Sequence, residues 1–294
     1  MLSVSSVVKD SPLYDAHNHY HDAWLAPHRA RVFADLASVG VRCAVVNGTC
    51  ETDWPDVTAL CAQFSTRNTR PLPSYGLHPW DVGNRSPDWQ KKLLAVLNAD
   101  PHAALGEIGL DRWILDRARP DDPRLAGLRR APLAEQIEAF AWQLDLAATR
   151  NLPASIHCLD AFGALHDLLR AARLPARGFL LHAYSGPAEM VKNFADLGAF
   201  FSFNGSFLDP RKTRLQELYA ALPADRLLVE TDAPAMRLPA PLEKFSLPAD
   251  ADGSVPNHPA NLAATYAALA GLRGVSPEAL AAQVEQNFLR LFGA

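Results

Sequence analysis

The sequence predicts a (β/α)8 barrel, the TIM-barrel form of an α/β fold. Short β-like runs alternate with longer segments of helical periodicity along all 294 residues, and eight such runs can be counted. Several of these runs end in a histidine or a carboxylate, and the active site of this fold lies at the carboxyl ends of its strands. We therefore expect a single barrel domain over residues 1–294.

The eight expected strands are short, mostly apolar runs. They cover residues 13–17, 42–47, 72–77, 103–108, 153–157, 178–182, 199–203 and 227–231. Helical periodicity is clearest over 133–149, where one apolar face is formed by Leu133, Ile137, Phe140, Leu144 and Ala148. Two further helices are expected after the last strand, over 261–269 and 277–292.

Two connections are long for a compact domain, 112–132 and 233–256. Long loops of this kind are more often functional than not, so we expect both to wall the substrate cleft. The first is rich in Arg and Asp. We expect its charged residues, together with Asp111 directly before it, to form a solvated mixed-charge surface, and contact with a phosphate is the alternative. Trp80 and Trp113 follow motif-bearing strands and could stack on a base or simply bury a loop.

Composition excludes some classes of function. A formal net charge of −4 and a pI near 6.2 argue against a broad basic surface for nucleic acid. The four cysteines form no C-x-x-C pair and indicate a reducing compartment with mostly buried thiols. No signal peptide and no run of about 18 apolar residues is found, so we expect a cytoplasmic protein with no membrane contact. No obligate protein partner is evident, and the oligomeric state stays open.

The strand ends carry a set of residues typical of metal ligands. In a strand, side chains two residues apart share a face, so the H-x-H pair would project both imidazoles toward one point. The full set is His17, His19, Glu107, His157, His182 and Asp232. Six ligands are too many for one catalytic ion that keeps an open position, so two ions fit better, and a carboxylate such as Glu107 can bridge them. Mixed N/O ligation favours Zn²⁺, Mn²⁺, Mg²⁺, Fe²⁺, Co²⁺ or Ni²⁺ over Ca²⁺.

The chain also resembles the TatD-type metal-dependent hydrolases of the amidohydrolase superfamily. The resembling segments span nearly the whole chain and are DAHNH (15–19), GLHP (76–79), GEIGLD (106–111), IH (156–157), HAYSG (182–186), ETDAP (230–234) and PANL (259–262). The resemblance implies one ion on His17, His19 and Asp232, a second on His157 and His182, and Glu107 as the bridge. It also implies hydrolysis of phosphodiester bonds, typically in DNA from an end.

The catalytic roles agree with the residue types. Divalent ions would lower the pKa of a bound water and clamp the phosphoryl oxygens, with Glu107 holding both ions. Asp232 could orient that water and accept its proton. The family places His78 near the substrate phosphate, and we assign it substrate binding or proton transfer to the leaving group.

The chain departs from the family pattern at three positions, one of which is His21, where members usually carry Asp. Leu159 stands where members often carry Arg, and His258 replaces the Glu of an Asn-Glu-Pro stretch. The expected substrate is DNA or a small phosphodiester. Two alternatives stay open: an amidohydrolase or lactonase acting on a C–N or C–O bond, and a metal-binding barrel without turnover.

Overall fold

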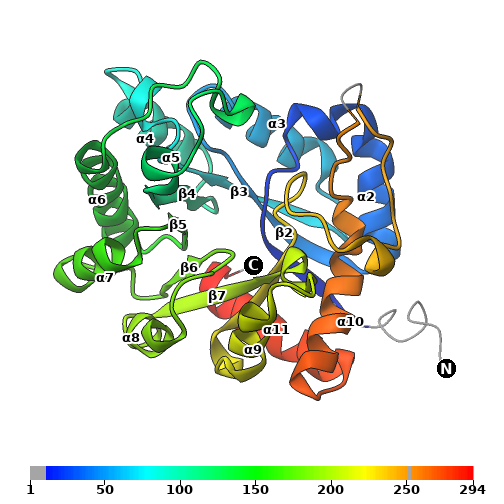
Figure 1. Cartoon of the computed structure of the whole chain (residues 1–294). Coiled ribbons are helices and arrows are strands. Elements are labelled where there is room, and N and C mark those ends of the chain that lie inside the picture. The colour runs from blue at the N-terminus through cyan, green and yellow to red at the C-terminus, as the bar shows by residue number, and fades with distance from the viewer. Residues whose placement is uncertain (1–10, 251–252, 294) are drawn as a thin grey trace. The chain divides into compact units, whose positions relative to one another are not determined.

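The computed structural model describes residues 11–250 and 253–293, and its eight strands confirm the (β/α)8 fold (Figure 1). The strands follow one another in chain order in one eight-stranded sheet, and the pairs β1–β2, β3–β4, β4–β5, β5–β6 and β7–β8 are parallel. Their bounds are β1 Leu13–Asn18, β2 Val41–Asn47, β3 Arg70–Tyr75, β4 Ala104–Asp111, β5 Ala154–Leu159, β6 Phe179–Leu181, β7 Ala199–Asn204 and β8 Leu227–Glu230.

Helices connect the strands, as the alternation of patterns predicts. The α-helices are α2 Arg29–Ser38, α3 Trp54–Phe64, α4 Trp89–Ala99, α5 Trp113–Asp116, α6 Leu133–Arg150, α7 Phe162–Ala171, α8 Val191–Asp196, α9 Thr213–Ala221, α10 Leu262–Arg273 and α11 Pro277–Phe292. Short 3-10 turns lie between them. The expected loop 112–132 therefore contains a short helix, α5, and the 3-10 turn Pro123–Leu125.

The strand bounds differ from the expected ones in one way that matters for the site. β4 continues to Asp111 and is buried along its whole length. The sequence predicts Glu107 at the end of this strand. In the structure it lies inside the strand. The pairing of β4 with β5 shifts register between Leu105 and Ile108, which marks an irregularity around Glu107.

The chain divides into two compact units. Unit 1 comprises residues 1–46, 59–72 and 201–294, and unit 2 comprises residues 47–58 and 73–200. The single domain expected over 1–294 stays a prediction. Each unit is described by itself.

In unit 1 the first and last strands are joined at their carboxyl ends. The amide of Asp232 donates to the carbonyl of His17 at 3.0 Å, and the amide of His19 donates to the carbonyl of Ala233 at 2.8 Å. At the other end of β1, the ring of Tyr14 lies 4.7 Å from that of Phe288 in α11. These contacts hold both ends of β1 and so fix the direction of the histidines at its carboxyl end.

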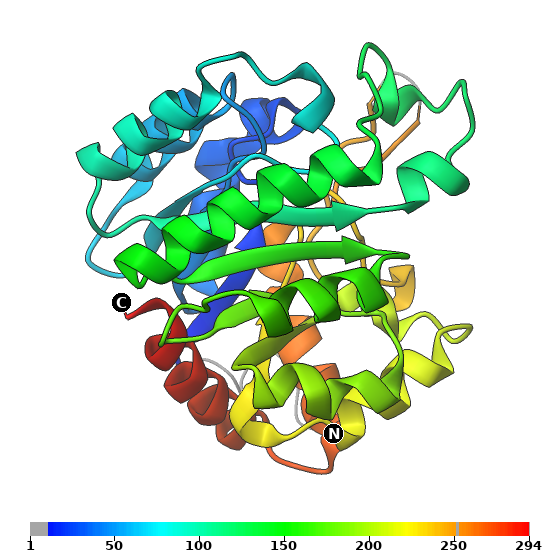
Figure 2. The same ribbon diagram turned by 90° about the vertical axis from the view of Figure 1, so that its left-hand side faces the viewer.

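In unit 2 the helix α6 runs alongside β4 (Figure 2). Its buried residues are Gln136, Ala139, Phe140, Gln143, Leu144 and Ala147. The expected apolar face is thus correct at Phe140 and Leu144, whereas Leu133, Ile137 and Ala148 are only partly buried. Two glutamines, seven residues and so about two turns apart, take part of the buried face instead.

Two smaller expectations also have outcomes. Cys43, Cys61 and Cys158 are buried free thiols, as predicted, and Cys50 is a partly buried one. Within residues 11–250 and 253–293, none of the helices combines the length and the apolar character needed to span a bilayer.

Candidate functional site

Unit 1 brings together three of the expected metal ligands. The Nε2 atoms of His17 and His19 lie 3.3 Å apart, and Oδ1 of Asp232 lies 3.6 Å from the first and 3.4 Å from the second. Asp232 follows β8 in the left-handed backbone region, at φ 50°, a conformation that Asp tolerates better than most residues. The H-x-H pair and Asp232 therefore form one cluster.

A buried carboxylate beneath this cluster holds its backbone in place. Asp15 accepts hydrogen bonds from the amide and hydroxyl of Thr231, at 3.0 and 2.6 Å, and from the hydroxyl of Tyr20 at 2.5 Å. The amide of His17 lies 3.4 Å from the same side chain. Burial raises the pKa of Asp15 to about 7, even though the hydrogen bonds from Thr231 and Tyr20 act in the opposite direction.

Unit 2 brings together the other three expected ligands. Oε1 of Glu107 lies 2.9 Å from Nε2 of His182 and 3.0 Å from Nδ1 of His157. The two imidazole nitrogens are themselves 3.2 Å apart. Glu107 is held from behind, because its amide donates to the carbonyl of Gly48 at 2.9 Å. The lone pairs of three side chains thus converge within unit 2.

His78 joins this second cluster. Its Nε2 lies 3.3 Å from Oε1 of Glu107, and its ring centroid lies 4.5 Å from that of His157. Its Nδ1 accepts a hydrogen bond from the amide of Trp80 at 3.2 Å, so the neutral ring carries its proton on Nε2. Burial lowers the pKa of His78, against the raising effect of Glu107.

Asp111 lies in surroundings that differ from the sequence prediction. It was expected on a solvated surface, but it is fully buried, and its Oδ2 lies 3.1 Å from Nε2 of His157. Burial alone would lower the pKa of His157, yet the hydrogen bonds to Asp111 and Glu107 outweigh it and raise that pKa to about 9. The sequence gives little signal for this position, because Glu107 and Gly109 interrupt the apolar run before Asp111, which lies at the true end of β4.

The two clusters fit divalent cations. Each one directs imidazole nitrogens and a carboxylate oxygen toward a common point, and this is the donor chemistry of Zn²⁺, Mn²⁺ or Fe²⁺ sites. In unit 2 the ligand atoms of Glu107, His157 and His182 lie within 3.2 Å of one another, which is close enough for one ion. The carboxylate behind His157 is the outer partner that metal-bound imidazoles usually have.

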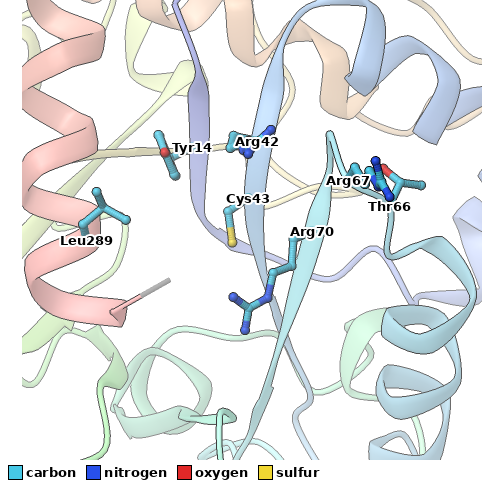
Figure 3. Close-up of a pocket in the computed structure, with 7 residues that line it drawn as sticks. All are labelled: Tyr14, Arg42, Cys43, Thr66, Arg67, Arg70 and Leu289. Atoms are coloured by element: carbon cyan, nitrogen blue, oxygen red, sulfur yellow. The ribbon is translucent and has the colours of Figure 1, made fainter.

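Unit 1 also contains a pocket that is separate from its cluster of expected metal ligands. Its volume is about 220 Å³, and it is lined by Tyr14, Arg42, Cys43, Thr66, Arg67, Arg70 and Leu289 (Figure 3). These residues come from the first positions of β1, β2 and β3 and their surroundings. None of the expected ligands lines the pocket, and it lies at the strand starts, whereas barrel active sites lie at the strand ends.

Two arginines of the Arg-rich connection are paired with carboxylates. Arg112 pairs with Asp116 at 2.8 Å and Arg117 with Asp160 at 3.2 Å. Leu159, at the departure from the family pattern, ends β5.

Comparisons with known proteins agree with the fold. A family model described as TatD related DNase matches residues 14–293. A protein named 3'-5' ssDNA/RNA exonuclease TatD from Klebsiella pneumoniae (strain 342) is 35% identical over 219 residues, which are 74% of this chain and 75% of the relative. The protein of the same name from Escherichia coli (strain K12) is 29% identical over 289 residues, 96% of this chain and 99% of the relative. The crystal structure of YJJV, a TatD homolog from Escherichia coli K12, has a TM-score of 0.79 at 27% identity and covers 96% of this chain and 98% of that one.

Proposed function

Because the chain belongs to the TatD-related DNase family, we propose that it hydrolyses phosphodiester bonds of single-stranded DNA at two divalent metal ions. It is a metal-dependent hydrolase of phosphodiesters, and the relatives named 3'-5' ssDNA/RNA exonuclease support attack from the 3' end. One observation carries the proposal: every ligand expected from the sequence belongs to one of two tight clusters of imidazoles and a carboxylate.

Each cluster has its own share of the ligands. His17, His19 and Asp232 would hold one ion, and His157 and His182 would hold the other. Glu107 would be shared, because a carboxylate has two oxygens and, in a (β/α)8 barrel, the strand ends form one active-site face. The donor set supports Zn²⁺, Mn²⁺ or another borderline cation.

The ions, when bound, would lower the pKa of a water toward neutrality and stabilise charge on the phosphoryl oxygens. Asp232 orients the attacking water and accepts its proton through a carboxylate oxygen. Asp111 holds the ring of His157, and Asp15 holds the backbone of His17 and Thr231. These two buried carboxylates keep the ligands preorganised, so little reorganisation is needed during the reaction.

His78 serves substrate binding in this scheme. Its Nδ1 is occupied by the amide of Trp80, which leaves Nε2–H directed toward Glu107. A neutral imidazole with this tautomer donates a hydrogen bond to a phosphate oxygen. We therefore favour phosphate binding over proton delivery to the leaving group.

The experiment measures metal content together with hydrolysis of three substrates. Single-stranded DNA, a generic phosphodiester and a carboxyl ester are offered to the metal-replete protein and to the same protein after chelation. We expect metal-dependent cleavage of DNA and of the phosphodiester. A 5'-labelled oligonucleotide should shorten in single-nucleotide steps if attack begins at the 3' end.

Other results would decide for the alternatives. Faster hydrolysis of the carboxyl ester than of either phosphodiester would favour an amidohydrolase or lactonase. A metal-replete protein inactive on all three substrates would favour a binding barrel without turnover.

A further inference from the structure

Two tryptophans and an arginine form a stack beside the metal-ligand cluster of unit 2. The rings of Trp80 and Trp113 are nearly parallel, with an interplanar angle of 21° and centroids 6.2 Å apart. The guanidinium of Arg124 lies over both rings, 4.7 Å from the centroid of Trp113 and 5.9 Å from that of Trp80. Both indoles stay partly exposed to solvent. We call Trp80, Trp113 and Arg124 the aromatic stack.

One carboxylate ties this aromatic stack to a metal ligand. Oδ2 of Asp111 accepts from Nε1 of Trp80 at 2.6 Å and lies 3.1 Å from Nε2 of His157. Its Oδ1 accepts from the amide of Ile114 at 3.0 Å, which fixes the start of α5 and so the position of Trp113. The same side chain therefore places both indoles relative to His157.

The stack is also charge-balanced. Nε and Nη2 of Arg124 bond to the two oxygens of Asp122, at 3.0 and 2.7 Å. The guanidinium is therefore fixed as a flat surface, and its charge is already paired with Asp122. Flat indole and guanidinium surfaces are what proteins use to stack nucleobases of single strands, with little dependence on base identity.

From this geometry we propose that the aromatic stack is the nucleobase subsite of the enzyme. It binds the base of the nucleotide whose phosphate is hydrolysed, mainly through Trp113. This inference rests on the proposed function, because it assumes that the phosphate is held at the ligand cluster. It predicts selectivity for nucleotides over other phosphodiesters without selectivity among the bases.

The test compares two substrates with the same leaving group. Thymidine 5'-(p-nitrophenyl phosphate) carries a base, whereas methyl p-nitrophenyl phosphate does not. We expect Trp113→Leu to lower kcat/KM for the thymidine ester roughly tenfold, mainly through KM, because stacking on one aromatic side chain contributes about this much. The methyl ester should stay within about twofold of wild type, and Trp113→Phe should recover most of the thymidine activity.

A matched control comes from the same unit. Trp142 of α6 packs edge to face on Trp89, with centroids 5.0 Å apart, so Trp142→Leu removes an indole outside the aromatic stack. It should leave the ratio of the two kcat/KM values unchanged. An equal loss on both esters in Trp113→Leu, or no loss on either, would overturn the proposal.

Calorimetry separates failure of this inference from failure of the proposed function. Binding of dTMP and of 2-deoxyribose 5-phosphate is measured for wild type and Trp113→Leu. If Trp113→Leu weakens the binding of dTMP and not that of 2-deoxyribose 5-phosphate, the base subsite is supported, whether or not the esters are hydrolysed. The absence of hydrolysis of both esters would contradict only the hydrolase proposal. If wild type and Trp113→Leu bind dTMP with equal affinity, the proposed base subsite is wrong, whatever the rate of ester hydrolysis.

Discussion

At the scale of single residues, the side chain of Asp111 connects three different partners. It is fully buried and its side chain bonds to a histidine ligand, an indole and a backbone amide. Burial would raise its pKa, but the hydrogen bonds from His157 and Trp80 lower it below the usual value of an aspartate. An ionised carboxylate in this position orients the imidazole and increases its basicity.

The first prediction concerns this carboxylate. Asp111→Asn removes the negative charge while keeping the shape, so the affinity for the ion bound by His157 should fall about 10- to 100-fold. The change is measured by titrating metal into the chelated protein. Asp116→Asn is the control, since Asp116 is exposed and pairs with Arg112 in the same connection. Unchanged affinity in Asp111→Asn would contradict the role given to Asp111.

The second prediction concerns the backbone beside His157. Gly109 in β4 has φ 149°, and a Cβ there would overlap the carbonyl of His157 in β5. Gly109→Ala should therefore destabilise the protein by about 1–3 kcal/mol and lower activity, because β5 must shift. Urea unfolding checks the first effect and phosphodiester hydrolysis the second. Gly163→Ala in α7, where a Cβ meets nothing within 4 Å, should be neutral or slightly stabilising.

At the scale of elements, α6 acts as a clamp on two strand ends. Gln143 accepts from the amide of Leu77 at 2.8 Å and donates to its carbonyl at 3.1 Å, directly before His78. Gln136 does the same for Asp111, at 2.8 and 3.0 Å. Each glutamine thus satisfies a backbone amide and a backbone carbonyl where the hydrogen bonding of a strand ends. This is why polar residues occupy part of the buried face of α6.

The third prediction follows from this clamp. Gln143→Leu leaves the amide and carbonyl of Leu77 buried without partners, and it should cost about 2–4 kcal/mol of unfolding free energy. It should also raise KM for phosphodiesters, because His78 is the next residue. Gln90→Leu, on the exposed side of α4, should change stability by less than about 0.5 kcal/mol. A loss no larger than in this control would argue against the clamp.

The fourth prediction concerns the junction of α2 with α10. Nε2 of His258 bonds to Oδ2 of Asp35 at 3.1 Å, and its Nδ1 accepts from the amide of Ala260 at 3.1 Å. Burial lowers the pKa of His258, the carboxylate of Asp35 opposes this, and Arg31 adds to the lowering. The unfolded chain therefore binds a proton more readily than the folded one.

The sign follows from linkage: the neutral imidazole contributes stability above about pH 6.5, and this contribution is lost as the pH falls through the folded pKa. His258→Asn keeps a side-chain acceptor for Ala260 but does not titrate. Its unfolding free energy should thus fall less than that of wild type between pH 7.5 and 5.5. Urea unfolding in the presence of a chelator measures this, and parallel pH profiles would refute it.

At the scale of the whole chain, the order of elements could be predicted from sequence because periods of 2 and 3.6 are local properties. The candidate ligands could also be picked out from the sequence, since each lies in or directly after an apolar run, and their binding of metal stays a prediction. The continuation of β4 past Glu107 could not, because Gly109 weakens the strand pattern and only its pairing with β5 sustains it. The same holds for Asp111 and the two glutamines of α6, whose partners are set by packing between distant segments.

The last prediction concerns how many ions the chain holds and how the ligands divide them. Wild type should contain two divalent ions per chain, measured by elemental analysis after dialysis. His19→Ala should lose one ion and His182→Ala the other, because these histidines belong to different clusters. Glu107→Ala should weaken both sites, since a shared carboxylate serves both ions.

Stability provides an independent measure of the same division. An ion at 100 times its dissociation constant stabilises the folded state by about 2.7 kcal/mol, so each single variant should lose part of the metal-induced rise in Tm and Glu107→Ala most of it. His102→Ala, at an exposed histidine, should behave as wild type. If Glu107→Ala still held one ion as tightly as wild type, the carboxylate would not be shared, and the two clusters would act as separate metal sites.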